Sequence, residues 1–478
     1  MALLLAGAPP AQAHPFVRAT DPPQGARLQG APQQVRLVLN EAAVPGLSTV
    51  TVRSREGRTV AAGPLPLDPD RRGGALALPP LAGGTYTVTW KVLAAVDGHV
   101  VRGRLRFSVL LPTLPGGPLE TEAPEPPPPA APLWLRVLLA LRTLGMWVHL
   151  AALLAVFGGL LGWAAILRPF APEVPPPLVR LVIRGSLLGV ASALLVMQSE
   201  WLEVSDAPWP ETLQVLLFFP AIPVALGTYS SIAAFVRAAL LTGTVSLATR
   251  IPERDPLALP GIAAFGAGAL LSLSAASHTA AAGGWPWAAP DFVHLVAGAI
   301  WVGGLLCLAW LPVLAPAAPP ALAVRRFTPW AAGAAAALWA TGIGNALVHL
   351  PTLAALWTSA YGLALAVKTL LVMVMIALGG ATLLRTEGKG LPWRRGERAG
   401  PGWSIRLELL VGIAVVLCAA ALTQLPPPAT TTAARGPFFP APAPAVLAVA
   451  ASAVGLLVGL GLQRAVAARA ARDAASSR

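Results

Sequence analysis

The sequence predicts two structural classes in one chain: a small antiparallel β-sandwich or barrel, followed by an all-α polytopic membrane domain. Hydrophobic residues make up 55% of the 478 residues and charged residues only 12%. The mean hydropathy is +0.67, which is too apolar for a soluble globular protein. Short alternating runs separated by turn residues occupy the amino-terminal part, and long apolar runs occupy the rest.

The chain begins with a short apolar stretch, MALLLAGAPPAQA, that ends in an Ala-x-Ala cleavage pattern. Residues 1–13 are therefore predicted to be a signal peptide, and because the usual basic start is missing we expect it to be truncated. Cleavage after Ala13 would make His14 the first residue of a domain outside the cytoplasm.

Four runs between residues 14 and 111 have the composition of β-strands. They are VRLVLN (35–40), STVTVRS (48–54), TYTVTWKVL (85–93) and RLRFSVLL (104–111), and Gly, Pro and Asp residues separate them. Short strands at this spacing predict a small antiparallel sandwich or barrel. Residues 112–132 are rich in proline, which predicts a semi-rigid linker.

Nine apolar segments after the linker are long enough to cross a bilayer. They lie near 134–167, 177–203, 226–249, 258–281, 290–314, 327–350, 358–385, 404–424 and 441–463, and 211–225 is ambiguous. About eight helices are thus expected within 133–428, and the ninth lies within 429–478 as an extra C-terminal helix with a basic tail.

The charges in the loops predict the orientation of these helices. Basic residues gather in alternate loops and in the tail: Arg168, Arg180, Arg184, Arg250, Arg254, Arg325, Arg326, Arg385, Lys389, Arg394, Arg395, Arg398, Arg464, Arg469 and Arg472. The opposite loops carry almost no Lys or Arg and have the acidic residues Glu203, Asp206, Glu211 and Asp291. The positive-inside rule therefore places the β-domain outside the membrane and the C-terminus in the cytoplasm. The net charge is +13, but the Lys and Arg residues are scattered in short clusters between apolar runs and form no basic aromatic surface. Nucleic acid is therefore not an expected partner.

The membrane domain contains a parallel internal repeat. HLAALLAVFGGLLGWA begins at His149, and HLVAGAIWVGGLLCLA begins 145 residues later at His294. The same offset relates Glu200 to Asn345. Four predicted helices lie in each period, so both copies have the same orientation, as in some transporters.

The six histidines all fall outside the predicted cytoplasmic loops. His14 and His99 belong to the β-domain, and the other four lie near the outer ends of predicted helices: His149, His278, His294 and His349. Neutral imidazoles are good metal ligands, and polar groups at membrane depth are functional candidates. The pattern favours a shared metal pathway, with interfacial or packing histidines as the alternative.

Asp97 and His99 flank Gly98, so on an extended backbone both side chains would project to the same side. A free amino-terminal His14 would add an amine and a ring nitrogen. Such a nitrogen and oxygen set favours Cu(II), and residues 14–111 contain no Met or Cys for a soft Cu(I) site. Asp-Gly is also a common turn signal, so the spacing alone is weak evidence.

Residues 14–111 resemble the periplasmic copper-binding CopC family. The resemblance rests on HPFVRATDPPQGARL at the start, LVLNEAAV (37–44) and GTYTVTWKVLAAVDGHVVRGRLRFSV (84–109). It implies a Greek-key (immunoglobulin-like) barrel with a Cu(II) site. In this chain the implied ligands are His14, Asp97 and His99, with Glu41 as a weak ligand or a supporting residue.

Residues from about 134 to 428 resemble the CopD membrane family. The matching segments are SAASHTAAA (274–282), HLVAGAIWVGGLLCLAWLP (294–312), TSAYGLALAVKTLLVMVMIAL (358–378) and RLELLVGIAVVLCAAALTQLPPP (406–428). Together the two resemblances imply a CopC–CopD fusion in a bacterial inner membrane. The expected membrane copper route uses His149, His294, His278, His349, Glu200 and Asn345, carrying Cu(I) or Cu(II).

Other residues of the helices have less specific expectations. Arg237 and Lys368 need a partner such as Glu200 or a backbone carbonyl, and they are interpreted as structural or gating charges. Glu200 and Asn345 have helix-to-helix hydrogen bonding as their alternative role. Cys307 and Cys418 are interpreted as small buried residues, and the methionines as gap-filling residues with Cu(I) binding as the alternative.

Copper capture followed by transport, in the direction of import, is the expected function. Copper ions and the lipid bilayer are the expected partners, and the cytoplasmic acceptor is not identified. No nucleophile or acid–base pair indicates an enzyme, and no nucleotide motif indicates ATP-driven pumping. One alternative is a haem or quinone electron carrier with His149 and His294 as axial ligands. Another is a copper sensor or buffer that moves no metal.

Overall fold

The computed structural model describes residues 17–39, 42–95, 98, 100–110, 133–205, 227–277, 288–350, 352–386, 402–425 and 428. It divides into two compact units. The first contains Met1–Ala140, Met197–Ile232 and Ala429–Thr431, and the second contains Leu141–Val196, Ala233–Pro428 and Thr432–Arg478. The predicted signal peptide, the linker and the ninth helix lie outside the described residues.

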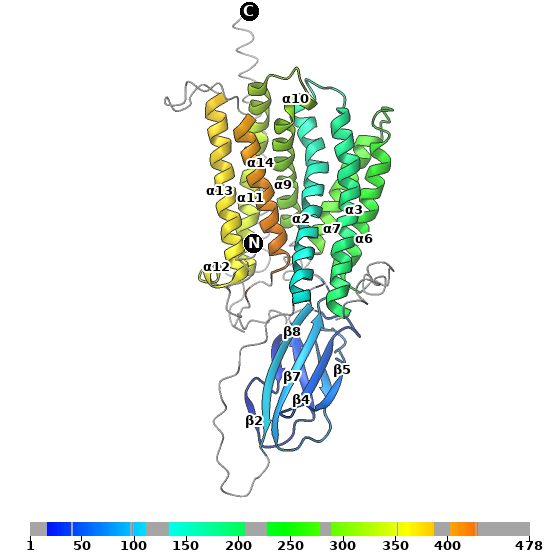
Figure 1. Ribbon diagram of the computed structural model, residues 1–478, viewed down its shortest axis with the longest axis vertical. Coiled ribbons are helices and arrows are strands. Elements are labelled where there is room, and N and C mark those ends of the chain that lie inside the picture. Colours follow the sequence, from blue (N-terminus) through cyan, green and yellow to red (C-terminus); the bar gives the residue numbers. More distant parts are fainter. Residues whose placement is uncertain are drawn as a thin grey trace, which may run out of the picture. The chain divides into compact units, whose positions relative to one another are not determined.

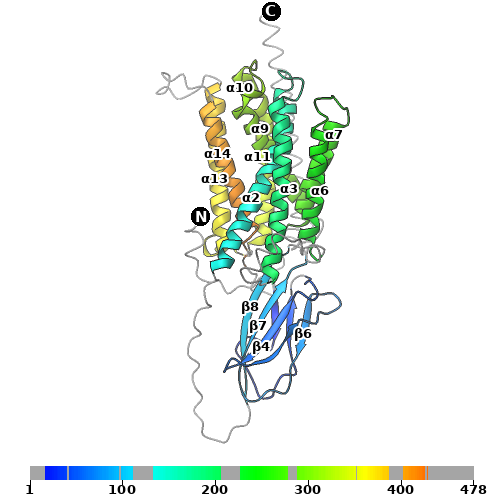
Figure 2. The ribbon, with the colours of Figure 1, turned by 45° about the vertical axis from the view of Figure 1, so that its right-hand side comes forward.

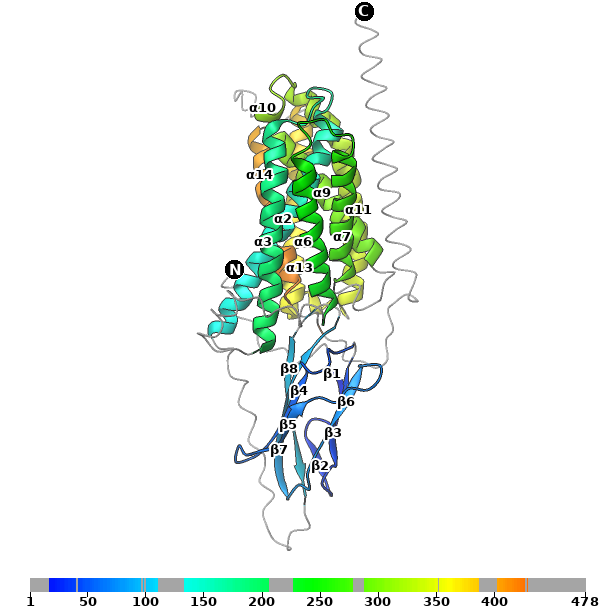
Figure 3. The same ribbon diagram turned by 90° about the vertical axis from the view of Figure 1, so that its right-hand side faces the viewer.

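Eight strands in the first unit form two sheets (Figures 1 and 2). The three-stranded sheet has the order β1 (Val17–Asp21), β3 (Gln34–Leu39), β6 (Gly73–Ala77). The five-stranded sheet has the order β2 (Ala26–Leu28), β8 (Val100–Val109), β7 (Gly84–Leu93), β4 (Thr49–Ser54), β5 (Thr59–Pro64). Figure 3 views these two layers from the side. A two-layer β-domain is therefore confirmed.

The core of this domain follows from the alternation seen in the sequence. Val35, Leu37 and Leu39 on β3 face Val88 and Trp90 of β7 and other inward residues, and all of them are buried in one cluster. Successive strand residues point to opposite faces, so the residues between them stay more exposed. These inward-facing residues form the hydrophobic core of the β-domain.

The four predicted runs correspond to β3, β4, β7 and β8. The prediction missed β1, β2, β5 and β6, which are three to six residues long and rich in Gly, Ala, Pro or charged residues. It was also wrong to expect only antiparallel pairing, because β2 runs parallel to β8. A three-residue edge strand carries no periodicity from which its direction can be inferred.

Eight long helices follow within the described residues (Figure 2). They are α2 (Leu133–Gly162), which continues into the π-helical turn η1 (Trp163–Leu167), α3 (Pro176–Ser205), α6 (Tyr229–Ala248), α7 (Ala258–Ala275), α9 (Ala288–Ala309), α11 (Pro320–His349), α13 (Ala360–Thr386) and α14 (Gly402–Leu422). The short helices α10 (Leu311–Leu314) and α12 (Ala355–Thr358) lie in connections. Apart from α11, each long helix is long and apolar enough to cross a membrane, which gives seven candidate spans.

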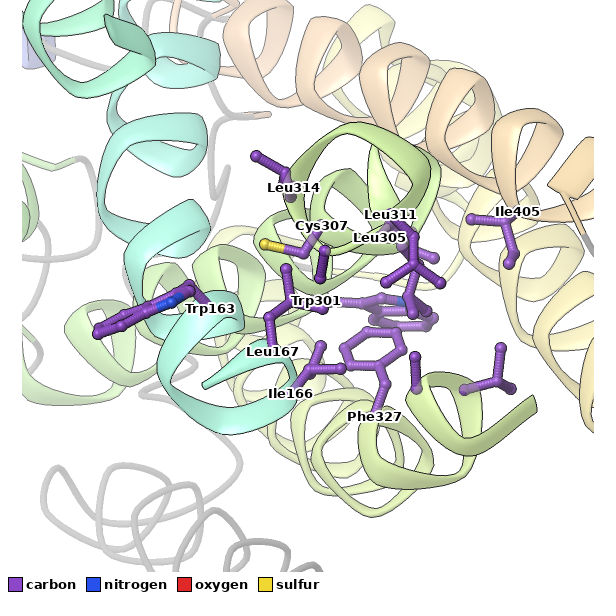
Figure 4. Packing of buried hydrophobic residues seen from close by; sticks show 14 of the residues in the cluster. Trp163, Ile166, Leu167, Trp301, Leu305, Cys307, Leu311, Leu314, Phe327 and Ile405 are labelled. Carbon is purple, nitrogen blue, oxygen red and sulfur yellow. The ribbon is translucent and has the colours of Figure 1, made fainter. Parts of the chain in front are cut away.

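Close packing of α2 against α9 depends on glycine. A Cβ atom at Gly303 would collide with the backbone of Gly158, and a Cβ atom at Gly158 would collide with the backbone of Ala299. Small residues allow such helices to approach closely in a membrane. Beside this crossing, Trp301, Leu305 and Phe327 belong to the largest buried cluster, shown in Figure 4.

The parallel internal repeat stays a prediction. The helix bounds are compatible with it, since α3 and α11, which occupy equivalent places in the two copies, both contain 30 residues. The glycines that meet between α2 and α9 are also separated by the predicted offset.

Candidate functional site

The expected Cu(II) ligands of the β-domain, His14, Glu41, Asp97 and His99, all lie outside the described residues. Their convergence on one ion stays a prediction. Gly98 is described, and its φ of +72° is a left-handed conformation that favours glycine. The backbone is therefore not extended at Gly98, and the argument from an extended backbone does not apply at this position.

Glu200 lies beside Gly98 within the first unit. A Cβ atom at Gly98 would lie 3.0 Å from Oε2 of Glu200 and would collide with Ser230. The carboxylate of Glu200 accepts hydrogen bonds from Ser230 Oγ at 3.2 Å and Ser231 Oγ at 3.1 Å, and the residue is 6% exposed. The structure thus brings one predicted route residue next to Gly98, which the sequence places between the expected ligands Asp97 and His99.

Further contacts fix the end of the β7–β8 hairpin in the same unit. Lys91 Nζ donates to the carbonyl of Val204 at 2.7 Å, and Arg102 Nη2 donates to the carbonyl of Glu203 at 2.8 Å. The amide of Tyr229 donates to the carbonyl of Ala95 at 2.8 Å. These bonds hold Lys91, Ala95 and Arg102, which flank Gly98 in the sequence, to residues 203, 204 and 229.

In the second unit, both ring nitrogens of the buried His149 are used. Nδ1 lies 3.0 Å from the carbonyl oxygen of Gly189 and 3.2 Å from Ser192 Oγ. A carbonyl can only accept, so Nδ1 carries the hydrogen and Nε2 has the lone pair. Nε2 accepts a hydrogen bond from Arg237 Nε at 3.2 Å. His149 is therefore one hydrogen-bond partner of Arg237, and it was not among the partners that we expected, Glu200 or a backbone carbonyl.

His294 has a different environment. Its Nδ1 lies 2.7 Å from Thr341 Oγ1, and that hydroxyl donates its single hydrogen to the carbonyl of Ala337 at 2.6 Å. Nδ1 of His294 must then be the donor, which leaves the lone pair on Nε2. No described residue hydrogen bonds to this Nε2. A neutral imidazole nitrogen with a lone pair, such as this Nε2, can bind a metal ion.

Asp291 and Asn345 extend the surroundings of His294. Asp291 is one helical turn from His294 on α9, and its Oδ1 lies 3.5 Å from Nδ2 of Asn345 on α11. Oδ1 of Asn345 is buried without a hydrogen-bond partner among the described residues. The amino group of Lys368 on α13 lies in the same neighbourhood as Asp291 and His294. We name Asp291, His294, Asn345 and Lys368 the α9–α11–α13 cluster.

The other predicted histidines contribute less to this cluster. The rings of His349 and Tyr361 meet edge to face with their centroids 5.7 Å apart, and His349 is buried. His278 lies outside the described residues. Within the part of the chain that the structure describes, no three His, Cys, Asp or Glu residues are arranged to hold a metal ion.

Sequence reasoning missed Asp291 and Glu408. Asp291 was interpreted only as a loop charge, although its spacing of three residues from His294 on a predicted helix indicated a shared face. Glu408 on α14 is 3% exposed and accepts a hydrogen bond from Trp301 Nε1 at 3.1 Å. It stands inside an apolar segment, and an ionisable residue there is a functional candidate by default.

Two family models match this chain. Residues 17–110 match the CopC domain, and residues 321–422 match copper resistance protein D. These matches confirm the resemblance to both families, the second over a shorter range than we expected. The helices α11, α13 and α14 fall within the second match, whereas α9 precedes it.

One relative and two solved structures are also similar to parts of the chain. "Copper transport protein CutJ" of Bacillus subtilis (strain 168) is 35% identical over 142 residues, which are 29% of this chain and 25% of that protein. The match therefore spans about a quarter of the relative's length. CopC from Methylosinus trichosporium OB3b is 27% identical and covers 21% of this chain and 96% of its own, with a TM-score of 0.20. The Escherichia coli copper resistance protein PcoC is 21% identical and covers 20% of this chain and 100% of its own, with a TM-score of 0.16.

Proposed function

We propose, starting from a chain that joins a CopC domain to a copper resistance protein D domain, that this protein captures copper outside the cytoplasm and carries it inward across the membrane. The observation that carries the proposal is the presence of both families in one chain whose helices are apolar enough to span a bilayer. The relative of Bacillus subtilis is named a copper transport protein, which also supports a function in copper transport.

The proposed capture site is a Cu(II) site in the β-domain. His14, Asp97 and His99 supply nitrogen and oxygen ligands, with Glu41 in support, and such a set suits Cu(II). Glu200 is the proposed first acceptor beyond this site, because its carboxylate oxygen lies next to Gly98. A carboxylate at this position can attract a cation that leaves the proposed Cu(II) site.

The proposed membrane route continues through the α9–α11–α13 cluster. Three groups there can face a cation: the lone pair of His294 Nε2, the carboxylate of Asp291 and the unpartnered Oδ1 of Asn345. His149 has no comparable free nitrogen, because Arg237 occupies its Nε2. We therefore assign copper binding to the second copy of the repeat and a structural role to the first.

The same geometry weakens the electron-carrier alternative. A haem bound by His149 and His294 would need Nε2 of His149, and iron ligation there would displace the guanidinium of Arg237. No described feature favours the sensor or buffer alternative, which differs from the proposal only in moving no copper.

Copper uptake by membrane vesicles tests the proposal. Right-side-out vesicles that contain the full chain should accumulate copper faster than inverted vesicles and vesicles without the protein. We expect His294→Gln to lower the uptake rate at least tenfold. His149→Gln is the matched control, because it should lower the amount of folded protein while each folded molecule keeps its uptake rate.

Three results would contradict parts of this proposal. Equal uptake with and without the protein removes transport. Faster uptake into inverted vesicles reverses the direction. Normal uptake by the His294 variant, or equal loss per folded molecule in both variants, removes the assignment of the route to the second copy.

A further inference from the structure

Glu408 is a buried carboxylate within an apolar helix. It lies on α14, is 3% exposed, and accepts one hydrogen bond, from the indole Nε1 of Trp301 at 3.1 Å. Among the described residues no Lys, Arg or His side chain pairs with it. A carboxylate with a single neutral donor in a bilayer is costly unless a cation or a proton neutralises it.

Met375 enters the same interface from α13. It is 3% exposed, and a Cβ atom at Gly412 of α14 would lie 3.3 Å from its Cε and 3.7 Å from its Sδ. A Cβ atom at Gly379 of α13 would lie 3.2 Å from Oε1 of Glu408. Each of the two side chains thus packs where the opposite helix has a glycine. The two helices lie side by side in Figures 1 and 2.

The register of these contacts brings the two side chains near one another. Met375 and Gly379 are one turn apart on α13, and Glu408 and Gly412 are one turn apart on α14. Since Met375 is opposite Gly412 and Gly379 is opposite Glu408, the thioether and the carboxylate enter one interface about one helical turn, roughly 5 Å, apart along it. Unbranched methionine has the rotatable bonds to close such a gap.

We propose that Glu408 and Met375 form an intramembrane Cu(I)-binding site between α13 and α14. The thioether is a soft ligand that selects Cu(I), and the carboxylate balances the single positive charge of the ion. Trp301 holds Oε1 and leaves Oε2 for the metal. The inference rests on the proposed copper transport, and it places a second binding step beyond the α9–α11–α13 cluster. Copper captured as Cu(II) must first gain one electron from a small-molecule reductant of the thiol or ascorbate class outside the cytoplasm, and the site then binds the resulting Cu(I).

The α9 helix connects the two sites. Asp291, His294 and Trp301 occur at spacings of three and seven residues, so they share one face of the helix. His294 and Trp301 are two turns apart, or about 10 Å along the axis. A copper ion that leaves His294 would therefore meet the indole of Trp301 and the carboxylate it holds.

The distribution of sulfur makes the site testable in the intact protein. Residues 14–132 contain no Met or Cys, so the β-domain cannot supply a copper–sulfur bond. Past residue 13, sulfur occurs only in the helical part: Met146, Met197, Cys307, Met373, Met375 and Cys418. Met373 is the matched control, since it lies two residues from Met375 on α13 but is 48% exposed.

X-ray absorption of the full chain in lipid nanodiscs, loaded anaerobically with Cu(I) from an ascorbate-reduced stock, is the deciding measurement. The wild-type spectrum should contain a sulfur shell that Met375→Leu removes and Met373→Leu keeps. Competition with a Cu(I) chelator should show at least tenfold weaker binding in Glu408→Gln. That variant keeps the side-chain shape, and its amide oxygen can still accept from Trp301.

The outcomes separate this site from the proposed function. A wild-type spectrum without sulfur, or a sulfur shell that survives Met375→Leu, overturns the site. A sulfur shell lost in Met375→Leu supports it, even if vesicles show no copper uptake and the proposed transport fails. Copper uptake that is normal in both Met375→Leu and Glu408→Gln overturns the site as a step of transport.

Discussion

The contact between Gly158 and Gly303 predicts the effect of a single added methyl group. In Gly303→Ala the new Cβ atom would overlap the backbone carbonyl of Gly158. Backbone atoms cannot rotate aside as a side chain can, so α2 and α9 must separate along their crossing. Overpacking of this kind costs about 1–3 kcal/mol, and we expect the upper end. Alanine recovers roughly 0.5–1 kcal/mol of helix propensity relative to glycine.

The expected net loss for Gly303→Ala is therefore about 2 kcal/mol, or roughly a 30-fold change in the unfolding equilibrium. Gly298→Ala is the matched control on the same helix, because its new Cβ atom would meet Leu154 Cδ2 at an ordinary 3.9 Å. That control should be as stable as the wild type or up to about 1 kcal/mol more stable.

The assay is the fraction of folded protein that remains after heating in detergent, measured by size-exclusion chromatography over a temperature series. Gly303→Ala should unfold at a clearly lower temperature than Gly298→Ala. If the two variants unfold together, then α2 and α9 do not cross at these glycines, and the packing argument fails.

Other predictions concern single contacts. Trp301→Phe removes the donor to Glu408 and should destabilise the folded protein by about 1–3 kcal/mol. Trp330→Phe should be nearly neutral, because the buried Nε1 of Trp330 has no hydrogen-bond partner among the described residues; equal melting of the two variants in detergent would contradict the role of the Trp301 bond. In the β-domain, Phe107 is 1% exposed, and Phe107→Ala should cost about 3–5 kcal/mol. The surface change Val38→Ala, at a residue 37% exposed, should cost much less. Circular dichroism melts of the β-domain would measure both variants, and equal melting temperatures would contradict the assignment of Phe107 to the core.

Hydrophobic periodicity explains which parts of the fold were predictable. The runs that became β3, β4, β7 and β8 alternate clearly, and the apolar segments are long enough to allow no other structure than helices. β2 and β6 have little alternation of apolar and polar residues, so their sequences do not reveal them as strands. They are identified only by their backbone hydrogen bonds to β8 and β3. Pairing between distant strands is not encoded in a local pattern.

The candidate site was predictable only in its residue types. Histidines near the ends of the expected helices were visible in the sequence, but their partners were not. Arg237 and His149 lie on different helices and are 88 positions apart in the sequence. Trp301 and Glu408 are 107 positions apart. Such contacts depend on helix rotation and crossing, which spacing within one helix does not determine.

The two histidines related by the predicted repeat show how a duplicated helix can acquire two roles. Each is held in the same tautomer by a bond at Nδ1, and each has a cationic residue from a later helix nearby. In the first copy the cation is Arg237, which keeps its charge under all physiological conditions and occupies Nε2. In the second copy the basic residue is Lys368. It lies near both His294 and Asp291, and no hydrogen bond joins it to the described ring of His294. An arginine bound to the imidazole stabilises one arrangement of helices. Arg237 and Lys368 are 131 residues apart, so the 145-residue offset does not relate them, and the neighbours of the two histidines differ in position as well as in type. Under the proposed function, the surroundings of Nε2 therefore determine which histidine can bind copper, because Arg237 occupies Nε2 of His149 and no described residue hydrogen bonds to Nε2 of His294.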